Sequence, residues 1–448
     1  MKPAFDWMRT ASLVAVLLAI GGAAWAQGAA PAAAQSPGYT TAEYNAYIAA
    51  KNTTDPQAKI KALDGFITQY NTPALMPFIL REYYTTYLAL KNYPKTMEYI
   101  DKYVALGDKI DAASKVTALY QRGQVYQAAA TDAAMQTAEM LTKTRDSAAQ
   151  GLTALAALQK PATASDAQFE ATKKTIGFMF NSVNGVAASY QKDYKAAQAA
   201  FKAALALNPE DNYTHYRLGV AYLQDTPPQA NDGFWELGRS IALKIPGDAQ
   251  VRTYLRGRLM QYQQPGCEKS ADEEVSQILT LASASGERPA DFNIPSAQDL
   301  QAARDDTNNF LPWLQEGGQH GQIMWLATCS LEYPDVAVRV MEIIPGDAPD
   351  KFTLRVFRAP TEGEMKAATA PNMEIHIVGQ PDVKRIPKDD YIRFTGTLSG
   401  YQPTPFMLTW DEAKVNPEDL QDLPPETPAP GGRGGRGGAA PGRGRGGA

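Results

Sequence analysis

The chain has few of the residues that usually build catalytic and metal sites. Two cysteines and three histidines occur in 448 residues. The histidines, His215, His320 and His376, lie far apart, and none has a second ligand at metal-binding spacing. No H-E-x-x-H, C-x-x-C or G-x-x-x-x-G-K-[ST] motif is present. The sequence therefore predicts no enzymatic activity, no cofactor and no metal site.

Strong charge and long hydrophobic runs are also missing. The formal net charge of −5 is small for this length and argues against a protein devoted to nucleic acid. The apolar run Ala11–Ile20 is about half of the roughly 20 residues that a spanning helix needs. Lys2 and Arg9 precede this run, and Ala24-Trp25-Ala26 follows it, which is the pattern of a cleavable signal peptide over residues 1–26. We expect a periplasmic or secreted protein with no membrane span after cleavage.

Export affects what the two cysteines can do. An oxidising compartment allows Cys267 and Cys329 to form a disulfide, whereas buried free thiols are the alternative. No cysteine follows the cleavage site directly, which argues against a lipid anchor.

Residues 39–262 have the composition and spacing of helices. Residues 27–38, rich in Ala, Pro and Gln, form a flexible leader before them. Apolar residues then recur three and four positions apart. Gly185 and Gly219 lie 34 residues apart within this region. One helix pattern near them contains Tyr194, Ala197, Phe201, Ala204 and Pro209, and the next contains Leu218, Gly219 and Tyr222. In these residues the chain resembles the tetratricopeptide repeat (TPR) family.

The resemblance is uneven along the chain. Asn181, Asn184 and Ala188 stand where the family usually has larger apolar residues, and Pro227 and Pro228 imply a longer turn. The pattern of residues 92–108 resembles that of the segment 101 residues later, which contains Tyr194 and Phe201. Weaker copies occur elsewhere. Longer helices are expected over residues 131–160 and 165–191. We expect about five helix pairs, most of them irregular.

The resemblance implies a mostly α protein in which stacked helix pairs form a superhelix, or solenoid, with a concave surface. In the helices around Gly185 and Gly219, some residues lie off the face that packs against the paired helix. These residues are candidates for contacting an extended peptide: Met179, Val186, Tyr190, Tyr213 and Tyr216. Packing against neighbouring helices is the alternative for each of them. The expected partner is a protein or peptide of the cell envelope.

The pattern changes after a helical connector expected over residues 263–330. Helices are predicted there at 271–284 and 296–313. Residues 331–421 then contain five segments of alternating polarity, which predict a small all-β domain, either a barrel or a sandwich. The last two segments resemble OB-fold proteins in these residues: Ile392, Phe394, Gly396, Leu398, Leu408, Trp410 and Val415. OB folds bind oligosaccharides or nucleic acids. Phe394, Tyr401 and Trp410 are either stacking residues of such a site or part of the core.

The chain ends in a Pro-rich and then Arg/Gly-rich tail, residues 422–448, which lacks apolar residues and is expected to be disordered. Its arginines are Arg433, Arg436, Arg443 and Arg445. For an exported protein they suit an anionic envelope polymer, an anionic lipid or the chain's own acidic linker better than RNA. The leading prediction is thus an exported, non-enzymatic scaffold that binds protein through its helices. The alternative is an oligosaccharide- or nucleic-acid-binding protein that uses the β domain.

Overall fold

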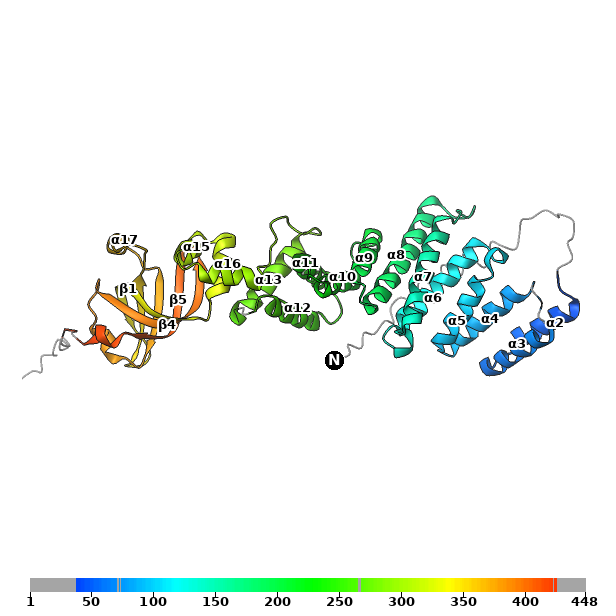
Figure 1. The fold of residues 1–448 in the computed structure, drawn as a ribbon, viewed down its shortest axis with the longest axis horizontal. Helices are drawn as coiled ribbons and strands as arrows, with labels where there is room; N and C mark the ends of the chain where they lie inside the picture. The colour runs from blue at the N-terminus through cyan, green and yellow to red at the C-terminus, as the bar shows by residue number, and fades with distance from the viewer. Residues whose placement is uncertain (1–37, 71, 73, 265–266, 422, 425–448) are drawn as a thin grey trace, which may run out of the picture. The chain divides into compact units, whose positions relative to one another are not determined.

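The structure, a computed structural model, describes residues 38–70, 72, 74–264, 267–421 and 423–424. The expected signal peptide, nearly all of the leader and nearly all of the tail lie outside these residues. The chain is mostly helical and has a five-stranded β barrel near its C-terminus (Figure 1). It divides into two compact units: one extends to Leu259 and includes Glu273–Ile294, and the other contains Met260–Asp272 and the residues from Pro295 onward.

The first unit is built from antiparallel helices joined by short turns (Figure 1). They are α2 (Thr41–Lys51), α3 (Pro56–Tyr70), α4 (Met76–Ala89), α5 (Tyr93–Val104), α6 (Ala112–Ala129), α7 (Ala138–Ala156), α8 (Asp166–Tyr190), α9 (Tyr194–Leu207), α10 (Asn212–Gln224) and α11 (Ala230–Ala242). Most of α12 (Asp248–Tyr262) and α13 (Glu268–Ala284) follows in the same unit. Each helix from α2 to α11 packs on the next one, and α8 also packs on α6 and α10.

One turn geometry occurs in two places 101 residues apart. Lys91 after α4 and Lys192 after α8 both adopt a left-handed conformation, with φ of 55° and 60°. The next residue, Asn92 or Asp193, donates its amide to the carbonyl five residues back at 2.9 Å. Its side chain then accepts a backbone amide from the first turn of α5 or α9. Lys244, with φ of 59°, ends α11 through the same pattern of backbone bonds. The sequence echo at this offset therefore corresponds to a shared local structure.

Two glycines allow close contact between paired helices. A Cβ atom on Gly185 would lie 2.5 Å from the ring of Phe201, which is fully buried on α9. A Cβ atom on Gly219 would lie 2.9 Å from the carbonyl oxygen of Gly233 on α11. Neither distance is compatible with a side chain, so these positions set how near α8 lies to α9 and α10 to α11.

Several helix boundaries differ from expectation. Residues 131–160 contain the short 3-10 helix η2 (Ala133–Met135) before α7 begins. The helix expected over residues 296–313 is two helices, α14 (Ala297–Asp305) and α15 (Phe310–Glu316). The break arises because the Asp306 carboxylate accepts bonds from the backbone amide of Asn309, at 3.3 Å, and from its side chain, at 2.7 Å. By contrast, the long helix α8 begins, as predicted, after a capping box at Ser165.

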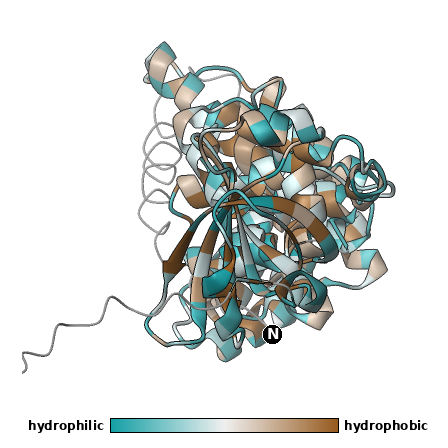
Figure 2. Cartoon of the chain, turned by 90° about the vertical axis from the view of Figure 1, so that its left-hand side faces the viewer, coloured by the Kyte–Doolittle hydropathy of each residue, from teal (hydrophilic) through white to brown (hydrophobic). Residues whose placement is uncertain are grey.

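The second unit contains a closed barrel with the strand order β1-β2-β3-β5-β4. Its strands are β1 (Glu332–Pro345), β2 (Lys351–Phe357), β3 (Met373–Val378), β4 (Tyr391–Pro403) and β5 (Phe406–Val415). Neighbouring strands are antiparallel except β3 and β5, which are parallel. Bands of apolar and polar residues follow one another along the strands in Figure 2, as expected for strands with one buried face.

Short helices complete this unit. Helices α14, α15 and α16 (Gly318–Thr328) share a continuous apolar core with the barrel. Helix α17 (Glu362–Ala367) connects β2 to β3, and η3 (Pro381–Arg385) connects β3 to β4. The last short helix, η4 (Pro417–Leu420), follows β5. The stretch expected as a separate connector, residues 263–330, is thus divided between the two units. The physical reason is that Leu300, Leu314 and Leu326 bury their side chains in the barrel core.

Cys267 and Cys329 are joined by a disulfide, with their Cα atoms 5.8 Å apart. Both belong to the second unit. The bond links the separate piece Met260–Asp272 to the end of α16, and Lys269 reinforces this link by donating to the carbonyl of Ser399 on β4 at 2.9 Å. The disulfide therefore joins the two separate chain segments that make up the second unit.

Candidate functional site

The five residues proposed from the sequence as ligand contacts lie on two helices. Met179, Val186 and Tyr190 are on α8, and Tyr213 and Tyr216 are on α10. Helix α8 packs against both α6 and α10, so these helices form one continuous layer. The two groups of candidates therefore belong to neighbouring elements.

Their exposure differs. Tyr190 is 39% exposed, whereas Val186 is 7% exposed and lies in the core that α6, α8, α9 and α10 share. Met179 is half-buried, and its Cγ would lie 3.5 Å from a Cβ on Gly123 of α6. Tyr213 and Tyr216 are half-buried, and the Tyr216 ring meets Tyr254 edge-on at 6.3 Å. The three tyrosines present surface to solvent, and Val186 contributes to packing.

A cation that the sequence analysis did not single out lies among these tyrosines. Arg217 is half-buried on α10. Burial lowers the pKa of its guanidinium, and Asp211, Tyr190, Tyr213 and Tyr216 are near enough to oppose that shift. We call Arg217 and these three tyrosines the Arg217 cluster. Tyrosines from α8 and α10 thus surround one guanidinium, which keeps its charge because the pKa of arginine is so high.

No hydrogen bond or ion pair satisfies Arg217 within the described ranges. The nearest acidic neighbour, Asp211, is used differently: its carboxylate caps α10 by accepting the amide of Thr214 at 2.7 Å. A half-buried guanidinium without a carboxylate partner stands out, because charged groups that are removed from water are normally paired. The Arg217 cluster therefore has unused capacity to bind an anion.

A buried tyrosine on α6, Tyr126, lies next to the cluster. Burial raises the pKa of Tyr126, and Tyr190 and Arg217 are among the charged or ionisable groups that influence it. The Tyr126 hydroxyl is buried without a hydrogen-bond partner among the described residues, as is that of Ser182 on α8. Tyr126 therefore supports the layer on which the cluster rests.

Chemically, the cluster is suited to recognition. A guanidinium offers several N–H donors in one plane and can hold a carboxylate with two parallel bonds. Tyrosine rings beside it supply flat apolar surface at low entropic cost. No nucleophile with an adjacent general base is part of this arrangement. The cluster can thus bind an acidic group next to an apolar one.

Each of the three histidines faces a carboxylate, and His215 is the buried one. His215 is 6% exposed, and its Nδ1 faces the Glu236 carboxylate while its Nε2 lies 2.9 Å from the carbonyl of Pro209. Both ring nitrogens of His215 therefore face hydrogen-bond acceptors, one on α11 and one in the turn before α10. His320 pairs with Glu316, and His376 pairs with Asp411 at 2.7 Å. In the part of the chain that the structure describes, no three His, Cys, Asp or Glu residues gather in a way that could hold a metal ion.

The outer face of the barrel offers little to a charged polymer. Arg355 on β2 is paired with Glu342 on β1 at 3.4 Å and with Glu374 on β3 at 3.0 Å. Two of the aromatic residues considered from the sequence are in the barrel core: Phe394 and Trp410 are each 1% exposed. The third, Tyr401, is half-buried and donates its hydroxyl to the carbonyl of Leu314. These three aromatics therefore pack and do not form an open stacking platform.

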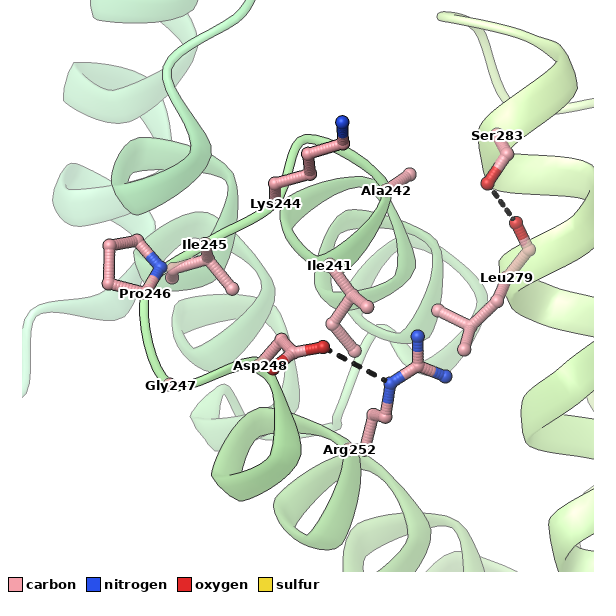
Figure 3. A pocket seen from close by; sticks show the side chains of 10 residues that line it. All are labelled: Ile241, Ala242, Lys244, Ile245, Pro246, Gly247, Asp248, Arg252, Leu279 and Ser283. Carbon is pink, nitrogen blue, oxygen red and sulfur yellow. Dashed lines mark hydrogen bonds and ion pairs between the residues drawn. The ribbon is translucent and has the colours of Figure 1, made fainter.

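Two open pockets have other compositions. Figure 3 shows a pocket of 560 Å³ at the turn between α11 and α12, where Arg252 points toward Leu279 and pairs with Asp248 at 3.7 Å. Another, of 570 Å³, lies beside a bulge of β1 around Met341. In the first pocket Arg252 is already paired with Asp248, and the remaining cation, Lys244, has no aromatic side chain beside it in the lining. This pocket is therefore a weaker candidate than the Arg217 cluster.

No family model matches the chain, and a comparison with curated proteins finds no match. None of the helices in the described ranges combines the length and hydropathy that a bilayer crossing requires.

Proposed function

We propose that this chain is an exported, non-enzymatic scaffold that binds an acidic segment of an envelope protein through TPR-like helices. The observation that carries the proposal is the Arg217 cluster, a half-buried guanidinium without an ion-pair partner among the described residues and with tyrosines on two neighbouring helices. Export rests on the signal-peptide pattern of residues 1–26.

The TPR-like architecture is supported by recurrent local structure. The turns after Lys91 and Lys192 have the same backbone bonds, and the glycines 34 residues apart each sit against a neighbouring helix. Stacked helix pairs of this kind leave one layer of helices on a concave side. In the proposal α6, α8 and α10 form that layer, and an extended peptide lies across it with a carboxylate at Arg217.

The test uses the mature protein, residues 27–448, and a library of fluorescent peptides. We expect the peptides selected by the wild-type protein to contain an acidic group, and replacing that group by its amide to weaken binding. A hydrogen bond to a charged group contributes about 1.5–3 kcal/mol, which corresponds to roughly 10- to 150-fold in affinity. Arg217→Gln should cause a loss of the same size.

Lys195→Gln is the matched control, since it removes one positive charge from an exposed position on α9. It should bind as the wild type does. Tyr213→Ala together with Tyr216→Ala should also weaken binding, because the peptide loses apolar contact area. Equal affinities of the wild type and Arg217→Gln would contradict the proposal.

A second candidate function uses the barrel. Its strand order, β1-β2-β3-β5-β4 with a short helix between β3 and β4, is that of an OB fold, which favours OB-like identity and oligosaccharide or nucleic-acid binding. The paired charges around Arg355 and the buried aromatics make the outer face a poor surface for a nucleic acid. A glycan array and a titration with fluorescent single-stranded DNA test this alternative. Saturable binding that is unaffected by Arg217→Gln would support the barrel.

The Arg/Gly-rich tail lies outside the described residues, and we propose contact with an anionic envelope polymer as its role. Deletion of residues 430–448 should reduce retention on an anionic polymer matrix and leave peptide binding unchanged. Equal retention of the two proteins would contradict that role.

A further inference from the structure

The second unit contains a cavity of 210 Å³ that is separate from the outer face of the barrel. Its walls come from α14, α15 and α16 on one side and from β1, β3, β5 and the end of β2 on the other. At about 30 Å³ per molecule in the liquid, this volume corresponds to roughly seven waters, enough for a ring-sized organic molecule. The cavity is thus of a size for a small ligand.

Three aromatic side chains line one part of this cavity. The rings of Phe310 and Tyr333 have centroids 5.3 Å apart, and the ring of Tyr333 meets Trp410 edge-on at 5.4 Å. They belong to α15, β1 and β5. Their contacts with one another and with the barrel core fix their positions. The cavity therefore has a rigid aromatic wall.

Positive charge lines another part. Arg358, just after β2, donates from its guanidinium to the carbonyl of Ala337 at 2.8 Å, and burial lowers its pKa. No carboxylate of the described residues lies within ion-pair distance of Arg358. Arg304 is a second cation in the lining. The carboxylate in the lining, Asp306, already accepts two bonds from Asn309. Two guanidinium groups and one carboxylate therefore line the cavity.

A buried donor without an acceptor belongs to the same wall. Trp410 is 1% exposed, and its indole N–H has no hydrogen-bond partner among the described residues. A buried donor left unsatisfied costs about 1–3 kcal/mol and calls for an explanation. An acceptor brought by a ligand, reached through a small shift of the ring, would remove that cost.

We propose that this cavity binds a small organic acid that has one carboxylate and an apolar ring. The carboxylate lies against the Arg358 guanidinium, and the ring lies on the wall of Phe310, Tyr333 and Trp410. Thr307 and Thr328 complete the polar side of the cavity. This proposal does not depend on the Arg217 cluster, which belongs to the other unit.

The experiment titrates the mature protein with benzoate at constant ionic strength and follows tryptophan fluorescence and heat of binding. We expect saturable binding of benzoate and at least tenfold weaker binding of the neutral benzamide. Arg358→Gln should weaken benzoate binding at least tenfold and reduce the difference between the two probes. Trp410→Phe, which keeps an aromatic side chain but removes the indole N–H, should weaken benzoate binding as measured by the heat of binding.

Arg355→Gln is the control, because it removes the same charge from the outer face of the barrel and should bind benzoate as the wild type does. Circular dichroism and a normal melting curve establish that each variant is folded. The proposal is overturned if benzoate fails to saturate the folded wild-type protein, or if Arg358→Gln binds benzoate as tightly as the wild type.

Discussion

The buried ion pair between α5 and α6 gives the sharpest test of how the helical unit is held together. Arg122 on α6 is 1% exposed, and its Nε donates to the Asp101 carboxylate on α5 at 2.6 Å. Its Nη2 reaches the second carboxylate oxygen at 3.4 Å, and Nη1 donates to the Thr144 hydroxyl on α7 at 3.2 Å. One guanidinium therefore connects three consecutive helices.

Asp101→Asn keeps the shape of the side chain but removes the charge that compensates Arg122. Breaking a buried pair by removing one partner costs about 3–5 kcal/mol. The Asp101 side chain is 35% exposed, so water screens part of the interaction. We therefore expect about 3 kcal/mol, the lower end of that range. This value corresponds to a roughly 150-fold loss of hydrogen-exchange protection in α5, α6 and α7.

Hydrogen exchange followed by mass spectrometry measures this loss helix by helix in the full mature chain. Glu98→Gln is the matched control on α5, because Glu98 pairs with Lys95 and Lys102 at the surface and such pairs contribute 1 kcal/mol or less. Adding Arg122→Met to Asp101→Asn should restore most of the protection, since no unpaired charge then remains. Similar losses for Asp101→Asn and Glu98→Gln would refute the reasoning.

Three further predictions concern stability. Gly185→Ala should destabilise the helical unit by about 1–3 kcal/mol through overpacking. Gly65→Ala on α3 should stabilise the same unit by about 1 kcal/mol, because the added methyl group meets no atom within 4 Å. Equal shifts of the melting temperature for the two variants would contradict this prediction. Burial, together with the bond to Asp64, raises the pKa of Tyr83 in the folded protein. The stability that the protonated hydroxyl contributes is therefore complete below about pH 10 and is lost as the pH rises through the folded-state pKa. Tyr83→Phe should shift the pH midpoint of alkaline unfolding upward, and an unchanged midpoint would argue against this reasoning. Cys329→Ser should cost the second unit roughly 4 kcal/mol, because the disulfide closes a loop of about 60 residues; dithiothreitol should lower the urea midpoint of the wild type but not of the variant.

The sequence was most informative where polarity alternates. All five strands lie within residues 331–421, where five alternating segments were predicted, because the two faces of such a strand differ in burial. Alternation alone left barrel and sandwich equally open, since it does not specify which strands pair. The parallel pairing of β3 with β5, which closes the barrel, depends on contacts between segments about 30 residues apart.

Helix boundaries were harder to predict where a side chain competes with the helix. The apolar spacing across residues 296–313 continues through Asp306 and Asn309, and so it indicated one helix. The Asp306 carboxylate bonds locally to Asn309 instead, and the helix ends. Asp and Asn at this spacing were the available signal for the break.

At the candidate site, the sequence pattern also did not predict which single residues are exposed. Val186 and Tyr190 are four positions apart on α8, so helical periodicity places them on one face, yet they are 7% and 39% exposed. Arg217 lies directly after Tyr216, and an arginine in an amphipathic helix is usually a solvated residue. Its burial beside Tyr190 depends on the packing of α8 against α10, which the periodicity within one helix does not specify. The pattern along one helix could therefore name the tyrosines, but only the packing of two helices brings them around Arg217.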